Sequence, residues 1–379
     1  MTQYEVKDGV GIIPEGETVI DDSAFEDCKS LTSVIIPDSV TEIRSYAFRD
    51  CTGLKSIVIP KSVTEIWDKV FAGCTSLTSI VVSKGNKVYD SRNKSNAIIE
   101  TATNKLIAGC PNTIIPDSVT EIGADAFAYC TSLKNIVIPG SVTKIGEDAF
   151  YLCTDLSSIV IPNSVKEIAM GAFSGCTGLT SIVIPDAVSI PDKAFDCCNL
   201  KSITVVDEKG EAINNNNAIV SPRYRFYNDK GDYIFISNTL VVGCANTIIP
   251  ENVLAIGDEV FSWCEELESI VIPKRVKWIG SGAFNYCQNL KNVVIPDSVL
   301  MIDDFAFGNC KSLETVTLGT SAVKIKSDAF FNCPALKTIY VPAKKADYYK
   351  KCLPEELHSL IVELPAEKSE SKSESKSEK

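Results

Sequence analysis

A phenylalanine that returns every 23 residues is the feature that most constrains this chain. It occurs in three runs with that step: Phe25, Phe48 and Phe71; Phe127, Phe150 and Phe173; and Phe261, Phe284, Phe307 and Phe330. A fixed period of this length is typical of a solenoid, in which one repeat cannot bury its apolar side alone. The sequence therefore predicts a stack of similar turns around one continuous core, with no division into globular domains.

One repeat, Cys130–Phe150, reads CTSLKNIVIPGSVTKIGEDAF. The segment LKNIVIP predicts a short strand that ends at Pro139, because proline cannot donate to a ladder. The segment SVTKI predicts a second short strand, and the residues around Ala149 and Phe150 predict a single 3₁₀ or α turn at a corner. Each strand should pair with its copy in the next repeat, about 4.8 Å away.

This frame resembles the BspA-like leucine-rich repeats, also called the Treponema pallidum type, and it covers about Val10 to Val341. The resemblance implies a right-handed, mainly β leucine-rich repeat solenoid, shaped as a rod or arc, with two short parallel strands and one turn per repeat. It also implies a surface or secreted protein that adheres to host proteins, matrix or other cells. Repeat positions are scaffold positions, so the resemblance names no ligand.

Two irregular units interrupt the period, at about residues 83–116 and 205–250. In the first, Asn96–Glu100 and Lys105–Cys110 predict a β-hairpin across the polar turn TATN. The second has matching ends, with NAIV for NAII and LVVGCANTIIP for LIAGCPNTIIP.

The second unit also carries an aromatic insertion, SPRYRFYNDKGDYIFIS, around a predicted turn at 228–231. Rigid aromatic side chains are favoured at interfaces and in sugar recognition, so a protruding contact hairpin is one interpretation. The favoured interpretation is that the hairpin folds down and its rings pack on the solenoid. The candidate binding residues are Tyr224, Phe226, Tyr227, Tyr233 and Phe235.

Residues 342–365 resemble the C-terminal cap of such solenoids, with a short helix around Ala346–Cys352 and a last strand at Ser359–Leu364. The tail, 366–379, alternates charged residues with serine and is predicted to be disordered.

Charge and hydropathy exclude some partners. A net charge of −12 argues against nucleic acid, which needs a basic face. No run of 18 apolar residues is present, so no membrane span is expected. The first residues, MTQYEVKDGVG, lack the basic start and apolar run of a secretory signal. We therefore expect a cytosolic chain, a signal outside this sequence, or another export route.

Fifteen cysteines suggest a disulfide framework until their spacing is considered. Most of them share one repeat position, as at Cys130, Cys153 and Cys176, and so form a ladder along the core. Side chains in register point the same way, which suits neither a disulfide bridge nor four converging zinc ligands. We expect buried, reduced, structural thiols; bridging or metal binding is the alternative.

No catalytic constellation is evident. The one histidine, His358, has only Ser359 near it in sequence as a nucleophile, and no phosphate-binding loop or EF-hand is present. The sequence predicts a non-enzyme that needs no cofactor and no metal.

Two outward surfaces remain as candidate sites. The first strands carry a β-branched residue between their two inward aliphatics: Ile35, Val58, Val81, Val137, Val160, Val183, Val271 and Val294. These residues form either a long, shallow binding strip or a stripe that only reflects β-propensity. On the second strands an acidic face gives way in the second half to an apolar patch, made of Leu254, Ala255, Trp278, Leu300 and Met301. We expect this patch to bind a partner if it faces solvent.

The leading hypothesis is thus a surface or secreted module that binds a protein, matrix or glycan ligand. An intracellular leucine-rich repeat scaffold is the alternative, because the cysteines are expected to be reduced and no signal is present. An enzyme or the accessory domain of an enzyme is the least supported class.

Overall fold

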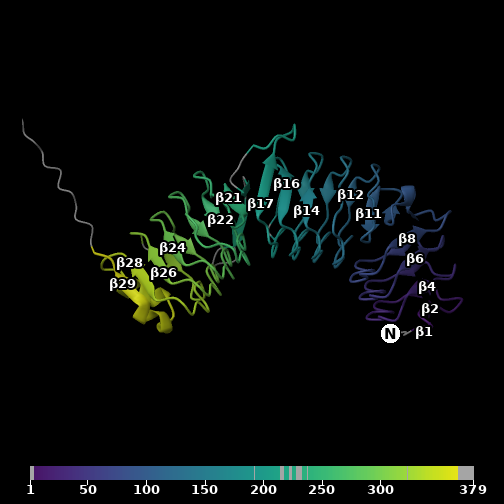
Figure 1. Cartoon of the computed structure of the whole chain (residues 1–379), viewed down its shortest axis with the longest axis horizontal. Coiled ribbons are helices and arrows are strands. Elements are labelled where there is room, and N and C mark those ends of the chain that lie inside the picture. Colours follow the sequence, from purple (N-terminus) through teal and green to yellow (C-terminus); the bar gives the residue numbers. More distant parts are fainter. Residues whose placement is uncertain are drawn as a thin grey trace, which may run out of the picture.

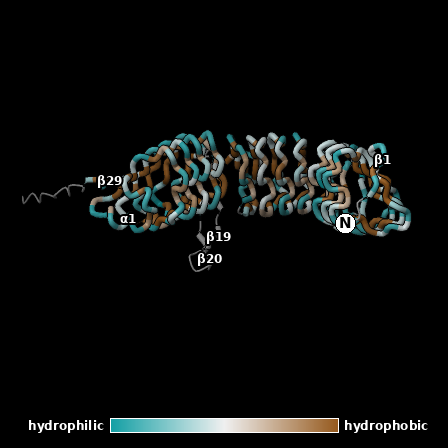
Figure 2. Tube along the Cα trace, turned by 90° about the horizontal axis from the view of Figure 1, so that it is seen from below, coloured by the Kyte–Doolittle hydropathy of each residue, from teal (hydrophilic) through white to brown (hydrophobic). Residues whose placement is uncertain are grey.

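The computed structural model describes residues 4–191, 193–213, 217–221, 224–227, 233–236, 238–321 and 323–365. They form a mainly β solenoid that bends into an arch, with the first turns at one end and the cap at the other (Figure 1). Hydrophobic and hydrophilic segments alternate along each turn (Figure 2). The predicted fold class, a leucine-rich repeat solenoid, is confirmed.

Two sets of short strands recur along the arch. The first set precedes the repeat proline or its equivalent and comprises β2 (Val10–Ile12), β4 (Ser33–Ile35), β6 (Ser56–Ile59), β8 (Ser79–Val82), β14 (Ser158–Val160), β16 (Ser181–Pro185), β17 (Ser202–Val206), β24 (Asn292–Ile295), β26 (Thr315–Leu318) and β28 (Thr338–Val341). The second set comprises β3 (Val19–Ile20), β5 (Glu42–Ile43), β7 (Glu65–Ile66), β12 (Glu121–Ile122), β13 (Lys144–Ile145), β15 (Glu167–Ile168), β22 (Ala255–Ile256), β23 (Trp278–Ile279), β25 (Met301–Ile302) and β27 (Lys324–Ile325).

Pairing within each set is parallel and without register slips, so equivalent residues stack on one another. On the second strands, for example, Glu121 lies beside Lys144 and Lys144 beside Glu167. Two expected first strands are missing. Residues 136–138 and 270–272 have no strand assigned, and each lies in the repeat that follows an irregular unit.

The irregular units and the ends complete the chain. The first irregular unit holds β9 (Tyr89–Asp90), the 3₁₀ turn η1 (Arg92–Lys94), β10 (Ile98–Glu100) and β11 (Lys105–Ala108); the second holds β18 (Ile219–Ser221), β19 (Tyr224–Tyr227), β20 (Tyr233–Ile236) and β21 (Thr239–Val242). At the ends lie β1 (Glu5–Lys7), α1 (Ala346–Cys352), η2 (Glu355–Leu360) and β29 (Ile361–Glu363). In each unit an antiparallel hairpin, β10–β11 or β18–β21, passes on to a parallel second strand.

The corner of each repeat is a short turn, as its sequence predicts, and left-handed residues set its shape. In the repeat around Phe150, Asp148 has φ 51° and Leu152 has φ 57°, both left-handed values that end any helix. These conformations turn three N–H groups toward the next repeat. Asp148, Phe150 and Leu152 donate to the carbonyls of Met170, Ala172 and Ser174 at 3.1, 2.8 and 2.9 Å. The corner is therefore a third backbone ladder, and its bonds hold non-glycine residues in a costly conformation.

Phenylalanine rings fill the core behind this ladder. The rings of Phe127, Phe150 and Phe173 are nearly parallel, with centroids 5.0 and 5.1 Å apart. Similar stacks run from Tyr4 to Phe71 and from Phe261 to Phe330. The described residues accordingly form three main buried clusters, one for each run of the 23-residue period.

The irregular units are partitions between these three cores. On β10, Ile98 belongs to the N-terminal core, while Ile99, which points to the other face, belongs to the middle core. On β21, Val242 belongs to the middle core and Leu240 to the C-terminal core. Each partition is thus a two-sided strand pair. On β10 this follows because successive residues of a strand point to opposite faces, whereas on β21 the two residues lie two apart, opposite a register shift between Ile219 and Val220.

Glycine stands in each partition where the next phenylalanine packs. A Cβ on Gly109 would lie 2.1 Å from Cε1 of Phe127, and one on Gly243 would lie 2.4 Å from Cε1 of Phe261. The ring packs directly on the backbone at both places, so each stack begins against a glycine.

Gly109→Ala should therefore destabilise the chain by about 1–3 kcal/mol through overpacking against a buried ring. Gly140→Ala is the matched control, since nothing lies within 4 Å of its added Cβ. Thermal unfolding followed by circular dichroism would show the difference. Equal melting temperatures for the two variants would contradict the packing described for Gly109.

All fifteen cysteines are free thiols in the structure. Ladder thiols after the first of each run have a specific contact, in which Sγ donates to the carbonyl of a phenylalanine in the preceding turn. The distance is 3.0 Å from Cys51 to Phe25 and 3.2 Å from Cys153 to Phe127. Burial raises the pKa of Cys51 to about 12, and it does the same for Cys130 and Cys264.

These thiols predict a loss of stability at alkaline pH. In the unfolded chain a thiol ionises near pH ~8.5, whereas in the folded chain Cys51 stays protonated up to about pH 12. A raised pKa in the fold gives stability that is complete below the unfolded pKa and is lost as the pH rises between the two values. Cys51→Ala should therefore weaken the fall in melting temperature between pH 8 and 11 more than Cys352→Ala does, since Cys352 is half-exposed in the cap. Equal pH slopes for the two variants would refute this account.

Candidate interaction surface

A line of exposed aliphatic side chains runs along the first strands and along the equivalent residues of turns that lack such a strand. We call it the aliphatic stripe. It consists of the residue two positions before the repeat proline or its equivalent; in β6, for example, Ile57 and Ile59 point inward and Val58 points outward. Its exposed members are Ile12, Ile35, Val58, Val81, Ile114, Val137, Val160, Ile248, Val271, Val294 and Val362.

The two most exposed members, Val137 and Val271, lie beside the irregular units. Val137 and Val271 are each 82% exposed, and Ile114 and Ile248 are 69% and 67% exposed. Sequence reasoning missed the last two because the period is broken there. The signal was present in the shared segment NTIIP, which places each isoleucine two residues before a proline.

Because equivalent residues of successive first strands pair in register, their outward side chains lie side by side and form one surface. Val58 pairs with Val81, and Val160 pairs with Val183. Toward the C-terminus the same ladder runs from Val294 to Thr317 and then to Tyr340. Side chains in one rung position are close neighbours, so the stripe offers linked apolar contacts, unlike singly scattered surface residues.

The stripe is hollowed in the C-terminal part of the arch. A shallow groove of about 560 Å³ lies over Val271, Val294 and Thr317, with Lys274 and Asp297 among its lining residues. This groove suits an apolar protein segment. The segment would contact the aliphatic floor, and the two opposite charges beside it would fix its orientation.

The predicted apolar patch on the second strands is only partly at the surface. Leu300 is 58% exposed, and Leu254 and Trp278 are half-buried. Ala255 is fully buried and Met301 is 9% exposed, so neither presents a side chain to a partner. The three strand residues stack in register, and Ala255 packs under Trp278 in a small apolar cluster of its own.

Trp278→Glu should therefore lower the free energy of unfolding by about 1–3 kcal/mol, because it places a charge in this half-buried cluster. Leu300→Glu on the neighbouring turn should leave stability within about 0.5 kcal/mol, since Leu300 is exposed. Chemical denaturation of both variants measures the difference. If Trp278→Glu were as stable as Leu300→Glu, the indole would be a free surface group.

The aromatic insertion is described only as a strand pair. β19 and β20 are antiparallel, with Tyr224 opposite Ile236 and Tyr227 opposite Tyr233. The side chains of Tyr224, Phe226, Tyr227, Tyr233 and Phe235 and the predicted turn at 228–231 lie outside the described residues, as does the predicted disordered tail, 366–379.

The described residues offer little for catalysis. His358 lies in the cap, with Nε2 3.0 Å from the carbonyl oxygen of Leu353. In the described part of the chain, no three histidine, cysteine, aspartate or glutamate side chains are grouped so that they could hold a metal ion. The one α-helix there, α1, has seven residues, and no helix in that part is long and apolar enough to cross a bilayer.

The repeat, its strands and its corners match one family. The BspA type leucine rich repeat region, in six copies, matches residues 11–106, 104–217 and 226–355. The chain belongs to the BspA-type leucine-rich repeat proteins. The predicted resemblance is thus confirmed.

A solved structure shows the same fold, and others are similar to this chain in sequence. A leucine rich cell surface protein from Faecalibacterium prausnitzii is 24% identical, with a TM-score of 0.50 over 90% of this chain and 89% of that one. A leucine-rich repeat protein from Bacteroides ovatus is 23% identical, with a TM-score of 0.46 over 94% and 92% of the two chains. The Treponema pallidum leucine-rich repeat protein is 22% identical, with a TM-score of 0.27 over 76% and 87%. No protein of curated function matches the sequence.

Proposed function

We propose that this chain is a non-catalytic protein-interaction module that binds its partner along the aliphatic stripe, and that it works as a surface or secreted adhesin. The observation that carries the proposal is the stripe itself, which keeps large aliphatic side chains exposed on rung after rung. Exposed apolar area is costly in water, and large contiguous patches on soluble proteins mark interaction sites.

The proposal of adhesion takes its direction from the family. A Faecalibacterium prausnitzii protein of this fold is described as a cell surface protein. A host or matrix protein is the kind of ligand proposed here, with glycans as a further class for the aromatic hairpin. The half-exposed residues Leu254, Trp278 and Leu300 are proposed as a smaller, secondary contact.

An intracellular scaffold is the second candidate, and one observation favours it. The fifteen cysteines are all free, and thiols stay reduced most readily in the cytosol. Protease shaving of intact native cells, with an antibody against this chain, separates the two. Loss of the signal with a cytosolic control untouched supports adhesion, whereas full protection supports the scaffold.

A charge placed in the stripe should abolish binding without unfolding the chain. Val137→Glu and Val271→Glu each put a carboxylate on the most exposed rungs, and such surface changes cost at most about 0.5 kcal/mol of stability. Solid-phase binding to purified collagen, fibronectin and laminin is the measurement. We expect at least about tenfold weaker binding for both variants, equal to about 1.4 kcal/mol.

Met170→Glu is the matched control, because Met170 is also exposed but lies at a corner, away from the stripe. It should bind as the wild type does. Unchanged binding by both valine variants would exclude the stripe as the contact surface. Failure of the wild type to bind any of the matrix proteins would instead count against adhesion.

A further inference from the structure

We propose that the two irregular units are joints of the arch, and that a lysine–carboxylate pair across each joint latches it closed. The three stacks would then move as firm segments about two fixed positions. Figure 1 shows the N-terminal turns set at an angle to the turns that follow β11. The argument rests on how the corners are tied within a stack and across a joint.

Inside a stack, backbone bonds tie each corner to the next. Tyr46, Phe48 and Asp50 donate N–H bonds of 3.4, 3.0 and 2.8 Å to the following corner. The irregular units have no such corner. At the first joint, Gly109 of the irregular unit lies against Phe127 and donates its N–H to the carbonyl of Ala126 at 2.8 Å. Among the described residues, no backbone hydrogen bond joins the corner at Phe71 to the corner at Phe127, or the corner at Phe195 to the corner at Phe261.

Side chains provide the contact across the first joint. Lys69 Nζ lies 3.2 Å from Oδ1 of Asp125 and 3.9 Å from Oδ2 of Asp148, and the first of these pairs is largely shielded from water. Ser132 Oγ donates to the carbonyl of Thr75 at 2.9 Å.

At the second joint, Lys193 and Glu259 occupy the equivalent positions. Burial raises the pKa of the Glu259 carboxyl, while a hydrogen bond with Ser262 and the charge of Lys193 lower it. Lys201 Nζ forms an ion pair of 2.6 Å with Glu266 across the same joint.

The latch residues share one repeat position, two residues before the phenylalanine. Lys69, Asp125, Lys193 and Glu259 all have a left-handed φ there, between 55° and 61°. Lysine occupies this position only in the last corner before each joint, and an acidic residue occupies it in the first corner after each joint. The other corners carry unrelated residues at this position: Ser23, Tyr46, Asp148, Gly171, Gly282, Phe305 and Asp328.

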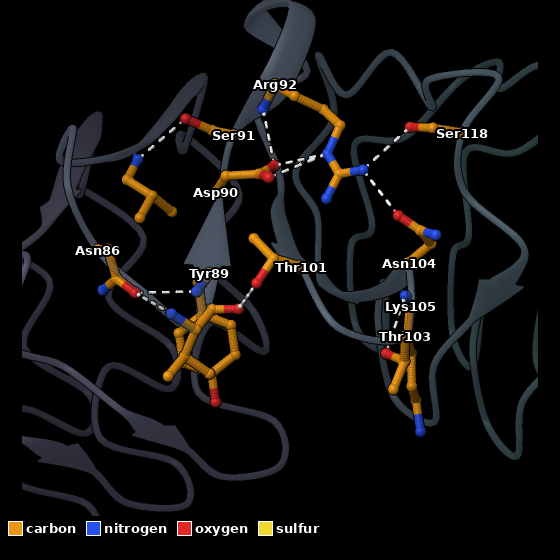
Figure 3. A network of polar contacts seen from close by, with 12 residues as sticks. Asn86, Tyr89, Asp90, Ser91, Arg92, Thr101, Thr103, Asn104, Lys105 and Ser118 are labelled. Carbon is orange, nitrogen blue, oxygen red and sulfur yellow. Dashed lines mark hydrogen bonds and ion pairs between the residues drawn. The ribbon is translucent and has the colours of Figure 1, made fainter.

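A separate polar network ties the first irregular unit to the turns on either side of it, and Figure 3 shows part of this network. Arg92 Nη1 donates to Oδ1 of Asn104 at 2.7 Å and to Oγ of Ser118 at 3.3 Å, which ties the irregular unit to the turn after it. Asn86 Nδ2 donates to the carbonyls of Pro60 and Val63, which ties the unit to the turn before it. With these contacts in place, opening occurs at the corner side.

Packing is also incomplete at both joints. A cavity of about 20 Å³ lies between Phe71, Gly109 and Phe127, and its equivalent of about 20 Å³ lies between Phe195, Gly243 and Phe261. Each has room for about one water molecule. Water entering at the corner would hydrate the latch first, since Asp125 and Lys69 line the first cavity.

The charges around Asp125 determine what happens when Lys69 is removed. The charges facing Asp125 are Lys69, Asp148 and Asp68, and burial raises its pKa more than Lys69 lowers it. Without Lys69, the partly buried carboxylates of Asp125 and Asp148 face each other with no cation between them. Removing one partner of a shielded pair leaves a charge that must regain water, so the joint should open.

Lys69→Met in the full chain tests the latch by hydrogen–deuterium exchange and small-angle X-ray scattering. We expect amide exchange in residues 124–130 to rise by about tenfold, equal to about 1.4 kcal/mol, with a changed radius of gyration. Lys144→Met is the matched control, because Lys144 forms a 3.1 Å pair with Glu167 between adjacent turns of one stack. It should leave both readouts unchanged.

A double variant, Lys69→Met with Asp125→Asn, should exchange less than the single variant, because the shielded carboxylate is gone. Exchange in Lys69→Met equal to that of the wild type, or an equal rise in Lys144→Met, would overturn the proposal. If Lys69→Met does not fold, Lys201→Met applies the same test to residues 258–264 at the second joint, because it removes the Lys201–Glu266 pair.

Discussion

The turn-to-turn contact at the corner is the constraint on which the rest of this structure depends. Three N–H groups per corner reach the next turn, and a phenylalanine ring stacks behind them at about 5 Å from its neighbour. Both contacts require equivalent residues to lie in register. This requirement keeps residues such as Asp148 and Leu152 in a left-handed conformation and gives the cysteine thiol its acceptor on the preceding turn. The strands, two to five residues long, are too short to impose that order alone.

The same register explains why surface features of this protein come as lines. A residue that faces outward on one turn is stacked on its copy in the next, so any bias in composition becomes a stripe. Aliphatic residues at one position give the stripe of Val58, Val160 and Val294, and alternating charges at another give the pair Lys144–Glu167. Binding energy on such a surface adds up along the arch, which suits an extended partner better than a compact one.

The fold could be predicted because its signal repeats. A period of 23 residues, the proline after the first strand and the Ala-Phe corner appear in copy after copy, and averaging over copies removes local ambiguity. The corner conformation could not be predicted, since residues as different as Tyr46, Lys69 and Glu259 adopt the same left-handed φ. The candidate surface was predicted in part. The exposed valines follow from alternation, whereas burial of Ala255 and Met301 depends on contacts outside their own strands.

The two-sided hairpins have a consequence for how damage spreads. Since Ile98 and Ile99 serve different cores, each stack is a separate thermodynamic segment joined to its neighbour by one strand pair. In a one-dimensional array, coupling passes only between adjacent units, so a weak interface limits cooperativity. A lesion in the ring stack at Phe150 is then confined to the middle third. Each partition limits local unfolding to one stack, so either end of the arch can stay folded while the middle stack unfolds.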